Sequence, residues 1–220
     1  EMIIEKYPDG NVKKLEGYIK IDTGIEKIYE INFYANGNKK EIKKYNKGKL
    51  EGKSITFFDN GNKESEITYS DGKRNGLRIV WYINGLKESE WRYYNDLRHG
   101  VCYQWNEKGN KIGDGEFVNG TGKFTEYYEN KNKKRFFDFD NNIGKIIEWS
   151  DNGQKSLEIE MKGFELNGHY ISWFANGEIC EEGEFIEGKR NGKWQSWYET
   201  GKKSSEGNYN SGTGKYISYY

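Results

Sequence analysis

Cysteine, histidine and long apolar runs are scarce in this sequence, and each shortage excludes a class of protein. The only cysteines are Cys102 and Cys180, which are too few for a disulfide framework. No run of about 18 or more apolar residues occurs, so the sequence predicts no transmembrane segment. The only histidines are His99 and His169, which leaves few side chains for acid–base chemistry near neutral pH.

Net charge is absent as well. Thirty-five basic residues balance thirty-five acidic ones, so no long-range field attracts phosphate backbones or anionic lipid. We therefore expect no nucleic-acid partner. Hydrophobic residues make up only 34% of the chain, but 16% of all residues are aromatic. Each such ring buries on the order of 150–250 Å², so the composition predicts a thin, extended, aromatic core and not a disordered chain.

A turn dipeptide recurs from one end of the chain to the other. Its glycines are mostly 24 residues apart, and one gap of 44 corresponds to two units of 22. The dipeptides are Asp9-Gly10, Asn36-Gly37, Asn60-Gly61, Asn84-Gly85, Lys108-Gly109, Asn152-Gly153, Asn176-Gly177 and Thr200-Gly201. Asn-Gly between alternating segments predicts a hairpin with a tight primed turn, because both residues tolerate positive φ.

A second glycine column lies between these turns and indicates a second turn in each unit. Its members are Gly52, Gly76, Gly100, Gly122, Gly144, Gly168, Gly192 and Gly214. Two turns per unit imply two strands per unit, and apolar residues do not follow helical spacing. The sequence predicts an all-β fold, an elongated antiparallel β-hairpin repeat (a meander or solenoid) that forms a single twisted sheet. Residues 1–220 form one repeat domain of about nine double-strand units, the first and last partial.

Aromatic columns mark the predicted strands. Five residues beyond the second glycine the ring is Phe57, Trp81, Trp105, Tyr127, Trp149, Trp173, Trp197 or Tyr219. We expect this column, with the mostly apolar column two residues earlier, to form the core face. Eight residues beyond the first glycine the side chain is Tyr18, Tyr45, Tyr69, Tyr93, Phe117, Phe139, Met161, Phe185 or Tyr209. Lys and acid columns follow the turns and lie on opposite faces unless a bulge intervenes.

Two sets of residues are candidates for a binding surface. The first is the row of rings that directly follows the predicted core column: Phe58, Tyr82, Tyr128, Phe174, Tyr198 and Tyr220. These rings either cover the turn ends or form an exposed row for a protein or ligand. The second is a basic stretch in the two shortened units, where a turn glycine is missing: Lys131, Lys133, Lys134 and Arg135. This irregularity is either a recognition site or sequence drift.

Catalytic and metal-binding patterns are weak. His99 and His169 each precede a second-column glycine, so we interpret both as turn residues. Cys102 and Cys180 fall in different columns and do not provide the ligand grouping of a zinc site. Acids recur in every unit, whereas a reaction centre is expected once. We therefore predict a protein that is not an enzyme, with no catalytic residues, no metal and no cofactor.

The repeat pattern resembles a known family. Residues 168–177 (GHYISWFANG) and 76–90 (GLRIVWYINGLKESE) combine a glycine, an alternating strand that ends in two aromatics, and Asn-Gly; Lys and Glu follow in the second. They resemble the bacterial MORN-repeat variant, the unit of the YwqK-like antitoxin family, and the likeness extends from about Tyr7 to Tyr220. The resemblance implies a MORN-like meander and protein binding. Some members of that family neutralise toxins encoded beside them.

A second resemblance gives the alternative function. Residues 192–198 (GKWQSWY) and 214–220 (GKYISYY) are similar to the aromatic hairpin repeats by which bacterial surface proteins hold choline or cell-wall glycan. The regular Lys and Glu columns favour the MORN variant. We expect a protein partner for an antitoxin-like or envelope-associated protein. Because the chain begins without an initiator methionine, we favour export or the envelope; an antitoxin would be cytoplasmic.

Overall fold

The computed structural model describes residues 2–140, 142–163 and 165–220 and confirms the predicted all-β class. The described residues form strands connected by turns, with no helix, so among them no helix is long and apolar enough to cross a membrane. The chain divides into two compact units, Glu1–Lys111 and Ile112–Tyr220, which are treated separately below. One repeat domain over residues 1–220 stays a prediction.

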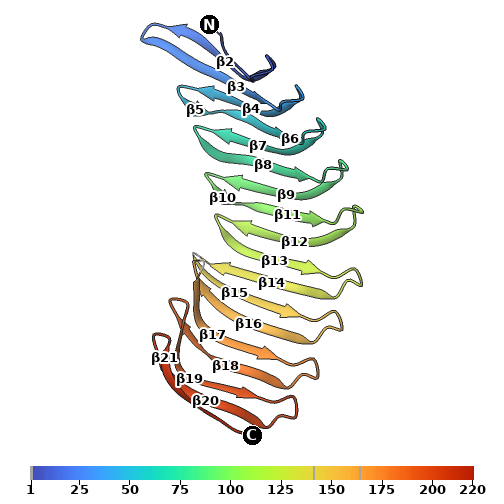
Figure 1. Cartoon of the computed structure of the whole chain (residues 1–220), viewed down its shortest axis with the longest axis vertical. Helices are drawn as coiled ribbons and strands as arrows, with labels where there is room; N and C mark the ends of the chain where they lie inside the picture. The colour runs from blue at the N-terminus through green and yellow to red at the C-terminus, as the bar shows by residue number, and fades with distance from the viewer. Residues whose placement is uncertain (1, 141, 164) are drawn as a thin grey trace. The chain divides into compact units, whose positions relative to one another are not determined.

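Unit 1 is an antiparallel meander in which consecutive strands pair (Figure 1). Its strands are β1 (Met2–Lys6), β2 (Val12–Ile21), β3 (Gly24–Phe33), β4 (Lys39–Asn46), β5 (Lys49–Leu50), β6 (Gly52–Phe57), β7 (Lys63–Ser70), β8 (Lys73–Trp81), β9 (Lys87–Tyr94), β10 (Leu97–Arg98) and β11 (Gly100–Trp105). Each of the short strands β5 and β10 is the start of the strand that follows it, separated by a single residue, Glu51 or His99.

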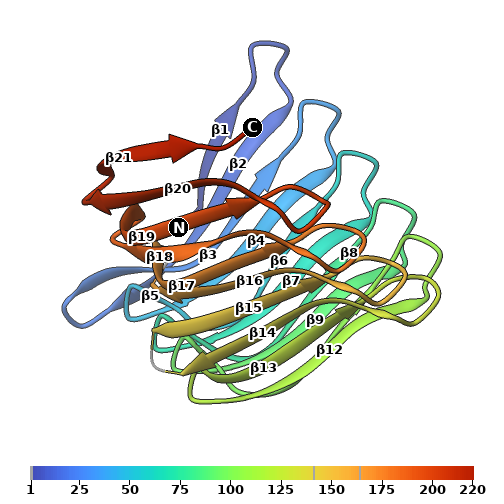
Figure 2. The ribbon, with the colours of Figure 1, turned by 90° about the horizontal axis from the view of Figure 1, so that it is seen from below.

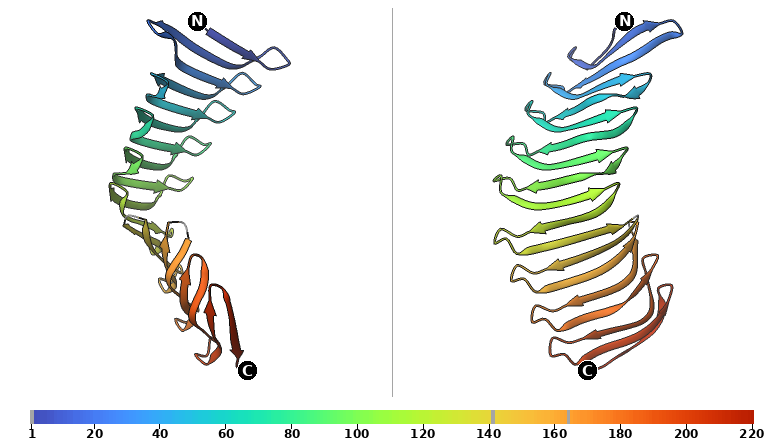
Figure 3. Two further views of the ribbon diagram at one scale, coloured as in Figure 1. Left: turned by 90° about the vertical axis from the view of Figure 1, so that its left-hand side faces the viewer. Right: turned by 180° about the vertical axis from the view of Figure 1, so that it is seen from behind.

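Unit 2 repeats this meander and forms one layer of strands (Figures 2 and 3). Its strands are β12 (Lys111–Val118), β13 (Thr121–Tyr127), β14 (Lys133–Asp140), β15 (Ile143–Trp149), β16 (Lys155–Lys162), β17 (Glu165–Trp173), β18 (Ile179–Ile186), β19 (Lys189–Trp197), β20 (Lys203–Asn210) and β21 (Thr213–Ser218). The predicted succession of hairpins is thus present in both units.

The turns at the first glycine column differ in type from the prediction. At Tyr34–Asn38 only Gly37 has positive φ, at 86°. The Gly37 amide donates to the Tyr34 carbonyl at 3.0 Å, and the Tyr34 amide donates to the Asn38 carbonyl at 2.8 Å. This is a type I turn followed by a glycine bulge, not a primed two-residue turn. The asparagine therefore does not take positive φ as we expected. Its side-chain oxygen accepts a hydrogen bond from the backbone amide two residues ahead; the Asn38 amide, for example, donates to the Asn36 side chain.

Primed turns do occur, but at the other end of the hairpins. Both central residues have positive φ at Lys47-Gly48, Asp71-Gly72, Asn95-Asp96, Asn119-Gly120, Glu187-Gly188 and Ser211-Gly212. The second turn of each unit is therefore not at the second glycine column, where we predicted it; Gly76, for example, lies within β8. Gly122 follows its turn by two residues, whereas Gly192 follows its turn by four and has positive φ, which explains the shortened units.

The strand glycines make room for rings on the neighbouring strand. Gly144 lies opposite Phe139 across β14 and β15. A Cβ atom at Gly144 would approach the Phe139 ring to 2.4 Å, which is closer than real contacts allow. In the column that we interpreted as turns, Gly122, Gly144 and Gly214 lie against rings in this way, whereas Gly52 and Gly192 have open space around them and positive φ.

In both units the sheet has two faces, which we name by their side chains. The packed face carries the column of Tyr69 and Phe185 and the side chains two residues beyond the second glycine, such as Ser54 and Trp194. The ladder face carries the Phe57–Trp197 column with the Lys and acid columns. The predicted core face is the ladder face, and this assignment was wrong, because the most buried apolar side chains lie on the packed face: Cys102, Phe117, Phe124 and Trp194, at 1–4% exposure.

Candidate binding surface

The ladder face is built by a bulge in the strand that follows each Asn-Gly turn. In β7, Lys63 pairs with Phe57 and Ser65 pairs with Thr56, so the register shifts around Glu64. The bulge brings Lys63 to the same face as Glu66, and the Lys63 ammonium lies 2.8 Å from the Glu66 carboxylate. The Lys and acid columns, which a regular pleat would separate, therefore form ion pairs along one face.

Several of these lysines also cover an aromatic ring. The Lys63 ammonium lies 5.6 Å from the centre of the Trp81 ring, within the range of a cation–π contact. The same combination of ring, lysine and acid occurs at Trp105, Lys87 and Glu90, and at Trp173, Lys155 and Glu158. Each such set of one tryptophan, one lysine and one glutamate is called a ladder triplet below. The tryptophans are half-buried, so each triplet presents a partly exposed ring beside an ion pair.

Lysines on both sides hold the ladder carboxylates in the charged form. Hydrogen bonds from Lys53 and Lys63 lower the pKa of Glu66. At Glu158, burial alone would raise the pKa of the carboxyl, but hydrogen bonds from Lys145 and Lys155 lower it. Both acids are therefore fully ionised near neutral pH and the ion pairs persist there.

Most tyrosines of the predicted row form hydrogen bonds that join one β-hairpin repeat to the next. The Tyr82 hydroxyl donates to the Trp105 carbonyl at 2.9 Å, and the Tyr128 hydroxyl donates to the Trp149 carbonyl at 2.8 Å. Tyr198 makes the same bond to the Tyr219 carbonyl at 2.7 Å. Phe58 and Phe174 occupy this position without a hydroxyl and are half-buried. Of the predicted row, only Tyr198 and Tyr220 are exposed, at 44% and 113%.

The predicted basic stretch is not brought together as one patch. Lys131 takes the left-handed turn position of the missing glycine, with φ of 68°. Lys133 lies over the Trp149 ring on the ladder face, whereas Lys134 lies over Tyr128 beside the turn. Arg135 is bound to Glu148 at 2.6 Å and stacks near Phe137, on the packed face. The four cations therefore have four different surroundings.

The two histidines and two cysteines occupy different kinds of position in the fold. His99 lies at the break between β10 and β11. We expected His169 in a turn, but it lies inside β17. Its imidazole is 3.4 Å from Glu182. Cys102 is buried and Cys180 is half-buried. Among residues 2–140, 142–163 and 165–220, no cluster of His, Cys, Asp or Glu has the arrangement of a metal site.

Asparagine contacts between successive turns are a feature that sequence analysis missed. The Asn84 amide donates to the Glu107 carbonyl at 2.9 Å, and the Asn176 amide donates to the Glu199 carbonyl at 2.7 Å. Asn36 and Asn130 make the same bond to Asp59 and Asp151. The only sequence feature that pointed to these contacts was the recurrence of Asn one residue before the turn glycine. The carbonyl that it binds lies in the next repeat and belongs to a residue that the sequence pattern does not single out.

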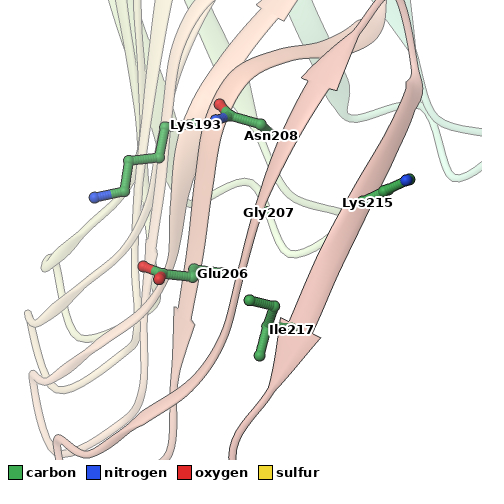
Figure 4. A pocket seen from close by; sticks show the side chains of 6 residues that line it. All are labelled: Lys193, Glu206, Gly207, Asn208, Lys215 and Ile217. Atoms are coloured by element: carbon green, nitrogen blue, oxygen red, sulfur yellow. The ribbon is translucent and has the colours of Figure 1, made fainter.

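An open depression of about 340 Å³ lies on the ladder face of unit 2, across β19, β20 and β21. Its lining residues are Lys193, Glu206, Gly207, Asn208, Lys215 and Ile217. Figure 4 shows Asn208 between Lys193 on one side and Lys215 on the other. Glu206 below them binds Lys203 at 2.8 Å and accepts the Tyr219 hydroxyl at 3.0 Å. Both hydrogen bonds lower the pKa of Glu206.

Three segments of the chain match the family model described as a MORN repeat variant: residues 50–71, 166–187 and 190–211. Segments 50–71 and 190–211 each run from one of the primed turns to the next, and all three segments contain an Asn-Gly or equivalent turn at their centre. The chain is therefore a repeat protein with units similar to this variant. No curated protein matches the sequence, and no named relative supports the narrower resemblance to the YwqK-like antitoxins.

Two solved structures that align with this chain are distant from it. A porin-like protein from Bacteroides uniformis aligns with a TM-score of 0.28 at 10% identity, over 93% of this chain and 92% of that one. A structure of TcdB2-TccC3-Cdc42 aligns with a TM-score of 0.19 at 14% identity, over 99% of this chain and 16% of that one. Neither similarity is close enough to support an argument about function.

Proposed function

We propose that this chain is a non-catalytic repeat protein that binds another protein through the ladder face. The ladder triplet is the observation that carries this proposal. It places half-buried tryptophan rings on rigid strands at the same position of several units, each beside a neutralised ion pair. Tryptophan is among the residues that dominate binding energy at protein interfaces, and a ring already fixed in place costs little entropy to immobilise.

Repetition also favours binding over catalysis. The same ring, lysine and acid recur in several units, whereas acid–base or nucleophilic catalysis requires one particular group of side chains brought together once. A row of equivalent sites suits an extended surface contact, as in other stacked-repeat proteins. The partner that we propose is a toxin made by the same cell or a component of the cell envelope, in line with the likeness to the MORN repeat variant.

The alternative is a glycan or choline-like ligand, and the ladder triplet argues against it. A choline cage needs several rings around one cation. On the ladder face the ring of Trp81 is already covered by the Lys63 ammonium. We therefore expect no retention of the protein on a choline resin and no signal on a glycan array. Specific retention by either would support the alternative.

A paired affinity purification tests the proposal. Wild-type protein and the double variant Trp81→Ser/Trp105→Ser are each used to capture partners from the source cell. We expect a reproducible protein partner with the wild type and at least a tenfold weaker capture with the variant, about 1.4 kcal/mol. The matched control is Ile83→Ser/Leu86→Ser, which removes exposed apolar side chains from a turn and leaves capture unchanged.

Two results would contradict protein binding through this face. One is the absence of any reproducible protein partner with the wild type. The other is equal capture by the tryptophan variant, provided that circular dichroism confirms an intact sheet. Loss of capture in the turn control as well would place the contact at the turns and not on the ladder face.

A further inference from the structure

An alternating row of charges crosses the ladder face of unit 2. Acids and bases face each other across successive strands: Lys123 opposite Asp138, Asp138 opposite Lys145, Lys145 opposite Glu160, and His169 opposite Glu184. In this row Asp138 lies between two basic residues, Lys123 and Lys145, whereas Glu184 lies between His169 and the neutral Asn191. The strand order therefore places opposite charges side by side, which stabilises the sheet modestly.

The series of acids at this strand position ends at Asn208. This residue pairs with Lys193 on β19 and with Lys215 on β21. It occupies the position at which the preceding strands carry an acid, but its side chain is a neutral amide. Neither Lys193 nor Lys215 has an ion-pair or hydrogen-bond partner in the described part of the chain, so two cations flank a position that lacks its carboxylate.

The usual partner of Lys193 is already engaged. At the same repeat position, Lys53 binds Glu66 and Lys145 binds Glu158, each at 2.5 Å. The equivalent acid for Lys193 is Glu206. One Glu206 oxygen binds Lys203, and the other accepts the hydroxyl of Tyr219, which stands where most units have a tryptophan or phenylalanine. The Tyr219 hydroxyl therefore takes the oxygen that the second lysine binds elsewhere.

From this geometry we propose that Lys193, Asn208 and Lys215 form a site for a carboxylate of an acidic segment in the protein partner. The site lies in the depression across β19, β20 and β21 (Figure 4). The chain itself supplies the template for the chemistry, because Glu66 and Glu158 each sit between two lysines. An external carboxylate would complete the same arrangement, with the Asn208 amide as an added hydrogen-bond donor.

This inference deepens the proposed function and rests on the ladder face being a protein-binding surface. It assigns the acidic part of the contact to unit 2, whereas Trp81 and Trp105 provide apolar contacts in unit 1. The two parts are therefore separable by substitution.

A titration with hexaglutamate peptide tests the site. Binding is measured by calorimetry at low ionic strength, because exposed charges are screened at higher salt. We expect wild-type protein to bind the peptide. Asn208→Asp supplies the missing acid internally with almost no change in shape, and we expect it to weaken binding about tenfold or more. Lys193→Gln/Lys215→Gln is expected to weaken binding by at least as much.

Lys145→Gln is the matched control. It removes one lysine at the same repeat position, but the ammonium of Lys145 is already bound by Glu158, so we expect peptide affinity to stay within about twofold. Equal weakening by this control would show nonspecific attraction and overturn the site. Absence of binding to the wild type, or unchanged binding to Asn208→Asp, would overturn it as well. Inorganic phosphate that binds at least as tightly and displaces the peptide would overturn the assignment to a carboxylate.

The outcomes separate this inference from the proposed function. If the captured partner is lost with Trp81→Ser/Trp105→Ser but retained with Asn208→Asp, the carboxylate site is wrong and binding through the ladder face stands. If hexaglutamate binds as expected but the tryptophan variant captures the partner normally, the carboxylate site stands and the proposed role of the ladder triplets fails.

Discussion

The packed face is held together by different chemistry in two regions of the molecule. Around Glu30, in the first hairpins of unit 1, it is a cluster of charges. Glu30 is only 9% exposed and binds Lys27 at 2.8 Å; Lys14 and Glu16 complete the cluster. Around Trp194, in unit 2, it is aromatic. The Trp194 ring lies 4.9 Å from Phe185 and 5.5 Å from Tyr170.

Strands are nevertheless paired antiparallel in both regions. Glu16 lies opposite Glu30 across β2 and β3, and Gly183 lies opposite Tyr170 across β17 and β18. The turns and strand glycines therefore determine the arrangement of strands, and the packed face tolerates either charges or rings as its filling. We therefore expect the free energy of unfolding to depend on pH through the charged cluster around Glu30, and on buried apolar volume through the aromatic cluster around Trp194.

Removal of the central ring should have the largest effect. Trp194→Ala deletes a side chain that is 2% exposed, and truncation of a buried tryptophan costs about 3–5 kcal/mol of unfolding free energy. Urea unfolding followed by circular dichroism measures the loss. Trp197→Ala, on the ladder face, is the control and should cost clearly less because its ring is half-buried. Equal losses in the two variants would contradict the assignment of the packed face.

Removal of one acid from the charged cluster should have an intermediate effect. Glu30→Gln keeps the shape but leaves Lys27 with weaker partners, and we expect a loss of about 1–2 kcal/mol. The measurement is again urea unfolding, with Glu51→Gln as the control, because the Glu51 carboxylate accepts the Asp71 amide and forms no ion pair with the described residues. A variant as stable as wild type would show that the cluster contributes nothing to the fold of the first hairpins.

The charged cluster should also make unit 1 sensitive to acid. Hydrogen bonds from Lys14 and Tyr18 lower the pKa of Glu16 to about 2, from 4.5. A lowered pKa contributes stability that is present above pH 4.5 and is lost as the pH falls toward 2. The stability difference between wild type and Glu16→Gln should therefore shrink between these values. A difference that stays constant from neutral pH to pH 2 would contradict the ionised cluster.

The smallest effect is expected from one hydroxyl. Tyr82→Phe removes the bond to the Trp105 carbonyl and should cost about 0.5–1.5 kcal/mol. The chain already carries phenylalanine at this position in Phe58 and Phe174, so the ring itself should pack normally. Thermal unfolding of the variant, compared with Phe58→Leu as a change of ring and not of hydroxyl, measures the bond. No loss of stability would show that the hydroxyl only faces solvent.

Much of the fold followed from periodicity, but the choice of face did not. The Asn-Gly recurrence predicted the hairpins correctly, because local turn chemistry is written in adjacent residues. The buried face depends on which side chains meet across strands, and the glycine opposite each ring, such as Gly183 opposite Tyr170, is informative only once the register is known. The bulge at Glu64 that brings Lys63 beside Glu66 likewise has no sequence mark of its own.

The candidate surface was only partly predictable for the same reason. Tyr82 and Tyr128 lie where the sequence placed them, directly after the column of larger rings. Their hydroxyls bind carbonyls more than twenty positions ahead, and no spacing rule within one unit could give that partner. The rings that we propose for binding are instead the half-buried tryptophans of the ladder triplets.

Hydroxyl-radical footprinting of the complex with the captured partner tests the division of the two faces most directly. We expect Trp81 and Trp105, on the ladder face, to be protected from oxidation when the partner is bound. Tyr69 and Tyr93, on the packed face of the same unit, should be oxidised equally with and without the partner. Protection of the two tyrosines with no change at the two tryptophans would contradict the account, because it would place the partner on the packed face.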